Sequence, residues 1–300
     1  MNVNGNNEKP ATAEDEYKKD PKIKKEDIEE LRKWARMQPD LPFNITEKEL
    51  ICFYHSCYYN IEDAKSCMKN YYSIRSNSPE FFSKRDIDSD ELRHINQAVY
   101  FSCFPVRDPK GNQIIFHKLK KFDAGSYVFD SGVKSLFMAF EGCTHQYGTV
   151  PGYALLFDMK GVGLFHLMRL SISSLRKMLV YQQEGMPIRL KTIHVMNTNS
   201  LISKIMFMMK PFMKKELIEM INFHTDMEPI YEIFTKDCLP SDYGGNLESC
   251  DVLHEQYLEH MRSLKTFFEK EEANLAVKNS DNPLSEKEEL ANSIDGLAIH

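Results

Sequence analysis

The chain has 300 residues, of which 42% are hydrophobic and 27% are charged, and this composition is typical of a globular protein with one or two domains. Its formal net charge of −6 excludes a bulk affinity for nucleic acid, so any anion site must be a local basic patch. No apolar run reaches the roughly 18 residues of a membrane-spanning helix, and the first residues lack the apolar core of a secretory signal, which predicts a cytoplasmic protein.

The seven cysteines form no CxxC pair and have no spacing typical of a small disulfide-linked domain. We therefore expect reduced thiols that are mostly buried. Residues 1–24 and 272–300 are polar and charged, with little apolar surface to offset the entropy lost on ordering. They predict a flexible tail at each end, and the second tail is acidic.

Residues 25–85 carry helical signals and no strand signal. An apolar stripe in residues 25–38 predicts a first helix. The capping box of Thr46 and Glu49 predicts a second helix, and Asn60 can cap a third. This part of the chain is therefore expected to form a helical bundle.

The hydrophobic period changes after the bundle, which indicates an α/β domain. The sequence predicts, in chain order, strands at 98–104 and 114–116, a helix at 126–147, a strand at 153–157, a helix at 171–184 and a strand at 189–196. The last three elements form a βαβ unit with a right-handed crossover.

Gly161 and Gly163 follow a predicted strand, as the glycines of a dinucleotide-binding turn do. The third glycine of that motif is missing, and the next strand ends at Asn197 without the carboxylate that holds a ribose. A tight turn is the better interpretation. GxSxG, Walker A and HExxH motifs are also missing, so the sequence predicts no enzyme and no cofactor. The sequence also predicts no metal site, because four histidines are too widely separated to have the spacing of metal ligands: His145, His166, His194 and His224.

Residues 206–220 contain five of the sixteen methionines of the chain. With the residues before them they form two adjacent apolar stripes at helical spacing: Leu201, Ile205, Met208 and Phe212, and Ile202, Met206, Met209 and Met213. A helix that is apolar on nearly all sides is buried in the core, covers a ligand or partner, or contacts a membrane interface. Pro211 predicts a kink or an end, with a restart at Lys214 and Lys215.

Four segments occur in the order and spacing of the CRAL-TRIO lipid-binding domain, and the chain resembles that family over about residues 25–265: GYALLFDMKGVGLFH (152–166), MPIRLKTIHVMN (186–197), KPFM (210–213) and LPSDYGG (239–245). Within the family it looks most like insect members similar to α-tocopherol transfer protein and to the clavesins. The resemblance implies a helical bundle (25–85) and then a CRAL-TRIO α/β domain (86–271), in which a mixed sheet floors an apolar cavity under a mobile gate helix at about 200–209.

The resemblance also implies which side chains line the cavity: Tyr153, Phe157, Leu164, Leu170, Met178, Tyr181, Met186, Ile188, Ile193, Ile205 and Met208. We expect a hydroxyl such as that of Ser135 or Tyr181 to orient a polar head of the ligand. Strand alternation places Ile188 inside and Arg189 with Lys191 outside, and the inward position of Ile193 then predicts a local irregularity in this strand.

In the tocopherol-carrier branch of the family, basic residues at the positions of Arg189 and Lys191 help to bind a phosphoinositide head group. Three further basic positions of that branch are Cys57, Glu216 and Met220 here, so the match is partial. The remaining residues expected near a membrane lie at or after the hinge of the gate: Lys210, Phe212, Lys214 and Lys215.

The resulting hypothesis is a cytoplasmic carrier, peripheral on membranes, that encloses one hydrophobic molecule of tocopherol, retinoid or similar isoprenoid character. Its expected partners are that lipid, a membrane surface to which it binds transiently, and a phosphoinositide. We expect no nucleic acid partner. The alternative is a phosphatidylinositol-binding adaptor in membrane trafficking that recruits a protein partner.

Overall fold

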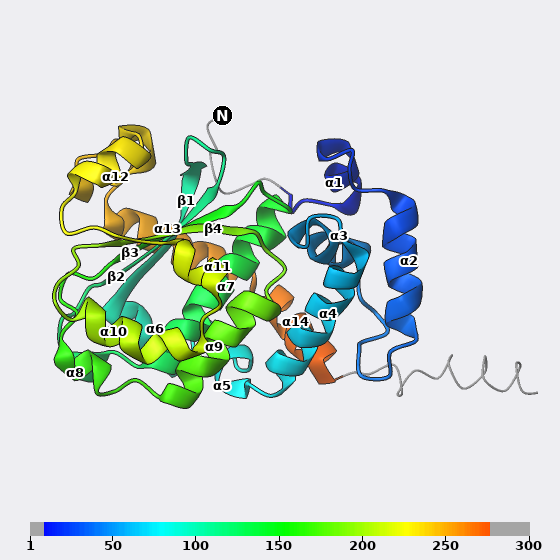
Figure 1. The fold of residues 1–300 in the computed structure, drawn as a ribbon, viewed down its shortest axis with the longest axis horizontal. Helices are drawn as coiled ribbons and strands as arrows, with labels where there is room; N and C mark the ends of the chain where they lie inside the picture. Colours follow the sequence, from blue (N-terminus) through cyan, green and yellow to red (C-terminus); the bar gives the residue numbers. More distant parts are fainter. Residues whose placement is uncertain (1–8, 277–300) are drawn as a thin grey trace, which may run out of the picture.

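Short helices form a bundle at the amino-terminal end (Figure 1). In the computed structural model, which describes residues 9–276, these helices are α1 (Ala13–Lys19), α2 (Lys25–Arg36), α3 (Glu47–Ser56), α4 (Ile61–Ser76) and α5 (Pro79–Phe82). The Thr46 hydroxyl and the Glu49 carboxylate each accept the other residue's amide at the start of α3. The Asn60 side chain accepts two amides at the start of α4. Both predicted caps are confirmed.

Helix α1 corrects the expectation of a flexible tail over residues 1–24. Its Glu16 is fully buried and accepts hydrogen bonds from the Thr149 amide at 3.1 Å and from Lys19 Nζ at 3.0 Å. Thr149 lies 133 residues after Glu16 in the sequence, so local composition could not reveal this contact. Residues 1–8 and most of the predicted acidic tail, 277–300, lie outside the described residues.

A five-stranded mixed sheet forms the centre of the α/β domain, in the order β1-β2-β3-β4-β5. Strand β1 is antiparallel to β2, and the other neighbouring pairs are parallel. The strands are β1 (Val99–Arg107), β2 (Gln113–Leu119), β3 (Tyr153–Asp158), β4 (Leu190–Met196) and β5 (Ile221–Phe223). The mixed sheet and the α/β class agree with the sequence prediction, to which the structure adds the edge strand β5.

The helices around the sheet include two that the sequence predicted, α7 (Phe129–Tyr147) and α9 (Ile172–Glu184), and a third long helix, α13 (Cys250–Ser263). Helix α6 (Asp90–Ala98) was missed, although Ser89 caps it and it buries Leu92 and Ile95. The remaining helical segments are short or terminal: η1 (Ala124–Ser126), α8 (Leu164–Leu167), α10 (Ile202–Met209), η2 (Lys210–Phe212), α11 (Lys215–Glu219), α12 (Glu228–Ile233), η3 (Lys236–Cys238), η4 (Ser241–Tyr243) and α14 (Lys265–Ala276).

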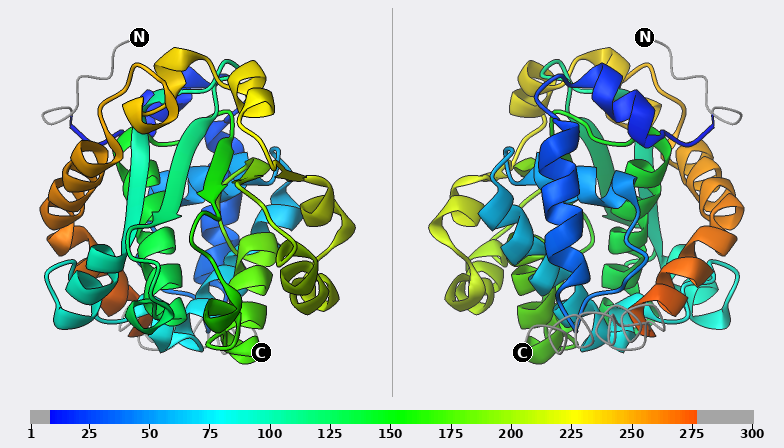
Figure 2. Two further views of the ribbon diagram at one scale, coloured as in Figure 1. Left: turned by 90° about the vertical axis from the view of Figure 1, so that its left-hand side faces the viewer. Right: turned by 90° about the vertical axis from the view of Figure 1, so that its right-hand side faces the viewer.

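Strand alternation gives the sheet two different apolar faces. On one face, Phe116 and Leu156 pack in a cluster with residues of α12 and α13. On the other face, Leu155, Phe157 and neighbouring side chains point toward α7 and α9. Viewed from the side of α12, the strands lie in front of the amino-terminal bundle (Figure 2). The side chains of the second face are therefore covered by helices.

The register between β3 and β4 shifts by one residue near Lys191. Tyr153 pairs with Leu190, whereas the next residue, Ala154, pairs with Thr192. The extra residue lets Ile193 face the same side as Leu155, with which it pairs. The predicted irregularity before Ile193 is confirmed.

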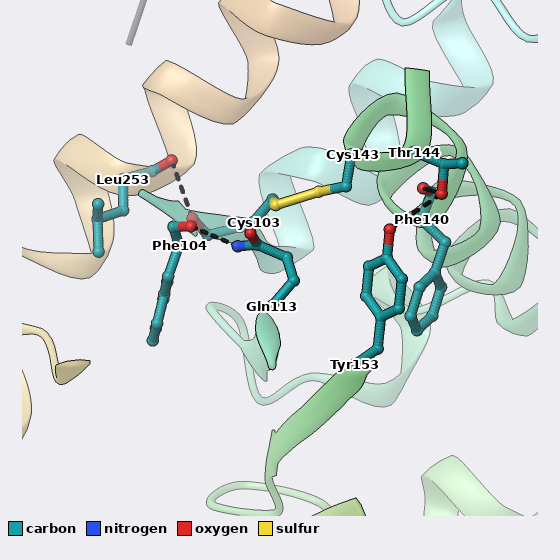
Figure 3. The surroundings of a disulfide bond; sticks show 9 residues. Cys103, Phe104, Gln113, Phe140, Cys143, Thr144, Tyr153 and Leu253 are labelled. Atoms are coloured by element: carbon teal, nitrogen blue, oxygen red, sulfur yellow. Dashed lines mark hydrogen bonds between the residues drawn. A yellow bond between two sulfur atoms is a disulfide. The ribbon is translucent and has the colours of Figure 1, made fainter. Parts of the chain in front are cut away.

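A disulfide joins Cys103 of β1 to Cys143 of α7 (Figure 3). This bond corrects the expectation that all seven cysteines are reduced thiols. The two residues are 40 positions apart, and the packing of α7 against β1 brings them together. The other five cysteines are free: Cys52, Cys57, Cys67, Cys238 and Cys250.

A buried ion cluster joins the bundle to the α/β domain. Glu141 of α7 accepts hydrogen bonds from Arg75 Nη1 and from Arg85 Nη1, each at 2.6 Å. The side chain of Arg75 is fully buried, and its guanidinium lies 4.6 Å from the ring centre of Tyr71 and 4.5 Å from that of Phe82. These two arginines hold the pKa of Glu141 below its usual value against the effect of burial, so the cluster is charged.

Candidate functional site

An apolar cavity of about 240 Å³ lies between the second face of the sheet and its covering helices. Leu155, Phe157, Ile193 and Val195 form its floor, and side chains of α7 and α9 form its walls. None of the described residues that line it is Asp, Glu, Lys or Arg. A charged group placed in this cavity would lose its hydration without gaining an ionic partner.

The methionine-rich segment forms the lid of this cavity, which we define as residues 202–219. Helix α10 ends at Met209, Pro211 lies in the short turn η2, and α11 restarts at Lys215, as the sequence predicted. No residue of α10, all of which are described, is buried. Its inner side chains nevertheless line the cavity: Ile202, Ile205, Met206, Met208 and Met209. The segment is therefore a cover over a cavity and not a core helix.

The structure divides the predicted cavity residues into groups. Six of them line the cavity under the lid: Phe157, Leu170, Met178, Ile193, Ile205 and Met208. Leu164 lies outside it, on α8, in a groove that α8 and α10 share. Ser135 is fully buried in α7 and lines none of the cavities described here. Tyr153 is also buried, and its hydroxyl lies 3.0 Å from Thr144 Oγ1 (Figure 3).

Tyr181, Met186 and Ile188 line a second cavity, of about 410 Å³, between the bundle and the α/β domain. The Tyr181 hydroxyl accepts a hydrogen bond from Arg75 at 3.2 Å, so it belongs to the ion cluster at the domain junction. Charged side chains line this cavity as well, among them Lys48, Glu49, Glu141, Lys270 and Glu271. Although it is larger, its charges make it unsuitable for a wholly apolar molecule, so the cavity under the lid is the better candidate.

Four polar side chains that the sequence did not assign to the site line the cavity under the lid: His117 of β2, Tyr127 before α7, His166 of α8 and Gln182 of α9. The ring of His117 stacks on Phe101 and lies 4.7 Å from the ring of Phe157. Burial lowers the pKa of His117 to about 4 and raises the pKa of Tyr127 to about 12. Strand alternation was the available signal, since His117 shares its face with Ile115 and Leu119.

The low pKa of His117 predicts a loss of stability in acid. Above about pH 6.5 its ring is neutral in both the folded and the unfolded chain; between 6.5 and 4 only the unfolded chain binds the proton. The free energy of unfolding should therefore fall, and His117 should contribute about 2 kcal/mol of the loss at pH 5. Urea unfolding at pH 7 and pH 5 tests this, since His117→Phe should reduce the pH dependence. His94→Phe, at an exposed position, is the control and should leave the pH dependence of stability unchanged. If the two variants showed the same pH dependence, the prediction would be contradicted.

The two cations expected to bind a phosphoinositide are engaged by the turn between α3 and α4. The Arg189 guanidinium lies 4.3 Å from the ring centre of Tyr58 and 5.0 Å from that of Tyr59, and its Nε donates to the His55 carbonyl at 2.8 Å. Lys191 Nζ donates to the Tyr58 hydroxyl at 2.7 Å. Within the lid, Lys214 pairs with Glu184 and Lys215 with Glu219, whereas Lys210 is exposed and Phe212 is half-buried.

On the outer side of the lid, α10 and the neighbouring α8 present an exposed apolar surface, which we define by Leu164, Phe165, Met168 and Phe207. The exposed fractions of Phe165, Met168 and Phe207 are 72%, 72% and 81%. Lys204 is also exposed in the groove between the two helices. Leu164, Met168 and Phe207 line that groove, and Phe165 is adjacent to Leu164 on α8. Large apolar side chains exposed together in this way are typical of an interaction surface.

The fold and the cavity define a class of α/β proteins that enclose an apolar molecule under a helical lid. Residues 98–245 match the CRAL/TRIO domain, and residues 20–92 match the Pinta-like UBA domain. The chain belongs to the CRAL-TRIO family, as the sequence motifs indicated. In the described part of the chain, none of the helices has the length and apolar character needed to cross a membrane.

Curated relatives support the same family. The human protein named alpha-tocopherol transfer protein-like is 24% identical over 243 residues, which are 80% of this chain and 70% of that protein. Clavesin-1 of Xenopus laevis is 22% identical over 240 residues, or 79% of this chain and 72% of the relative. The match to mouse clavesin-2 is 21% identical over 277 residues, which are 91% of this chain and 85% of that protein. The crystal structure of Sfh5 matches 85% of this chain and 97% of its own, with 13% identity and a TM-score of 0.48.

Proposed function

We propose that this protein is a carrier that encloses one hydrophobic molecule, of tocopherol, retinoid or similar isoprenoid character, and exchanges it at membranes. The observation that carries the proposal is the apolar cavity, free of charged lining residues, under a helix that has no buried residue. Burial of the ligand against this lining would supply most of the affinity, at about 25 cal/mol per Å² of apolar surface. No bond is made or broken in this function.

Opening of the lid gives the ligand its route to a membrane. The inner side of α10 faces the cavity, while Phe207 on its outer side belongs to the exposed apolar surface with Phe165 and Met168. Methionine side chains conform to ligands of irregular shape, which suits Met206, Met208 and Met209 to this inner position. Lys204 in the shared groove and exposed Lys210, directly after α10, would favour anionic lipid, with about 1 kcal/mol from each lysine close to the membrane.

A transfer assay tests the carrier function. Purified protein is mixed with donor vesicles that contain α-tocopherol or retinol and with acceptor vesicles that contain neither. The proposal predicts a stoichiometric protein–lipid complex and faster movement of the lipid between the vesicles. A protein that binds a partner from a lysate but neither binds nor moves a lipid would favour the adaptor alternative.

Replacing Phe207 by serine should weaken attachment to membranes about tenfold, because an exposed phenylalanine that enters a membrane interface contributes roughly 1.5 kcal/mol or more. Since Phe207 is 81% exposed, the fold and lipid loading should not change. Cosedimentation with phosphatidylcholine vesicles, with and without phosphatidylserine, measures the effect. Phe43→Ser is the matched control on the bundle, where the side chain is 37% exposed. Equal attachment of the two variants would exclude this docking surface.

Assistance by a phosphoinositide has weaker support. A doubly charged phosphate is bound by several convergent donors. Here Tyr58, Tyr59 and His55 already engage Arg189 and Lys191.

The proposed carrier would work in the cytoplasm. The redox state of the Cys103–Cys143 pair in cells tests this location, since disulfides are rare in a reducing cytosol.

A further inference from the structure

Three of the four polar side chains that line the cavity under the lid form one corner of it. His117, Tyr127 and His166 form this corner; the ring centres of Tyr127 lie 6.5 Å from His117 and 6.3 Å from His166. No hydrogen bond joins any two of the three side chains. Gln182 of α9 is the one other described lining residue with a hydrogen-bonding side chain.

The hydrogen bonds of His166 define which of its nitrogens carries the proton. The Gly163 amide donates to Nδ1 at 3.1 Å, so Nδ1 must be the unprotonated acceptor. In a neutral ring the proton is then on Nε2, and burial lowers the pKa of His166, which favours the neutral ring. The residue is 93% buried, and Nε2 has no hydrogen-bond partner among the described residues. It is therefore a donor without an acceptor, a state that is unfavourable in a buried site.

His117 has the opposite arrangement. Its Nδ1 lies 3.3 Å from the Tyr100 carbonyl, which accepts and cannot donate, so the proton of this ring is on Nδ1. Nε2 is then an acceptor, and no described residue donates to it. The Tyr127 hydroxyl likewise has no partner among the described residues. The corner thus offers a donor, an acceptor and a hydroxyl.

We propose that His117, Tyr127 and His166 bind the hydroxyl group of the enclosed molecule, so that the cargo is a neutral lipid alcohol or phenol. A hydroxyl donates one hydrogen bond and accepts others, so it can donate to His117 and accept from His166 or Tyr127. A carboxylate would lack a countercharge in this lining, and a hydrocarbon would leave all three groups without partners. This inference rests on the proposed carrier function and specifies the chemistry of its cargo.

Four ligands that share one isoprenoid chain test the inference: geranylgeraniol, its methyl ether, geranylgeranoic acid and the hydrocarbon without the oxygen. Each displaces diphenylhexatriene, an apolar fluorescent probe, from the full-length protein. The alcohol should bind about 3- to 10-fold more tightly than the ether, which cannot donate to His117, and more tightly still than the hydrocarbon and the acid. Equal affinities for alcohol, ether and hydrocarbon would overturn the hydroxyl site but leave the carrier function in place. If neither the probe nor any of the four binds, the carrier function fails as well.

Variants separate the roles of the three residues. His117→Phe keeps the stacked ring and should remove the preference for alcohol over ether. Tyr127→Phe and His166→Leu should each lower the affinity for the alcohol relative to the hydrocarbon about 3- to 10-fold. His166→Gln should restore part of this preference because it keeps a donor. Tyr231→Phe, on α12 and outside the cavity, is the matched control. Unchanged alcohol preference in all three corner variants would contradict the proposal.

Discussion

The Val195→Trp variant should bind lipid about 100-fold more weakly than the unchanged protein while it remains folded. Val195 lies on the floor of the cavity under the lid, and only 9% of its surface is exposed. An indole in this position occupies the space that the ligand needs, and overpacking of this kind costs roughly 3 kcal/mol. Displacement of diphenylhexatriene and uptake of retinol both measure the effect.

The same variant should be at least as stable as the unchanged protein in urea, because the new side chain fills a void that is otherwise empty without ligand. Val252→Trp, at an exposed position of α13, is the matched control and should bind lipid normally. If Val195→Trp bound lipid with unchanged affinity, the ligand would have to lie elsewhere, and the second cavity between the bundle and the α/β domain would be the next candidate.

Replacing Glu141 by glutamine should lower the free energy of unfolding by about 3–5 kcal/mol and the melting temperature by roughly 10 °C. The amide keeps the shape of the side chain but removes the carboxylate that the two buried arginines share at 2.6 Å. Arg75 then keeps only the more distant Glu271, at 3.9 Å, and Arg85 keeps Glu272, at 3.5 Å. Because Arg75 lies in the bundle and Glu141 in α7, unfolding should begin at the junction between the two parts. Chemical and thermal unfolding measure the loss.

Glu255→Gln, at an exposed position of α13, is the control for loss of a carboxylate and should not change stability. A triple variant with Arg75→Met, Arg85→Met and Glu141→Leu should recover most of the loss, since a buried ion cluster replaced by apolar side chains is often neutral in stability. A loss below about 1 kcal/mol for Glu141→Gln would show that the charge balance of this cluster is unimportant.

Local signals in the sequence predicted much of the fold. The caps at Thr46 and Asn60 and the break at Pro211 depend on a few neighbouring residues, and the structure has each where expected. Helix α6 was missed because it is short and mostly polar, with Leu92 and Ile95 as its large buried side chains, and it leads directly into β1. The disulfide and the anchor of α1 depend on contacts 40 and 133 residues apart, which no local pattern contains.

The candidate site was predicted less completely than the fold. Residues on the sheet and the lid could be placed from the family motifs, since strand alternation and helical spacing determine which way they face. Tyr181 and Ser135 were expected at the polar head of the ligand, but one bonds to Arg75 and the other is enclosed in α7. His117 and Tyr127 take the cavity position instead, and their approach to His166 depends on how three separate elements pack.

Native mass spectrometry of the full-length protein, incubated with a lipid alcohol such as retinol or geranylgeraniol, tests the central claim most directly. The carrier function predicts one bound molecule per chain in the unchanged protein and none, under the same conditions, in Val195→Trp. Absence of bound lipid in the unchanged protein, or equal occupancy in the two proteins, would contradict a lipid carrier that holds its cargo in the cavity under the lid.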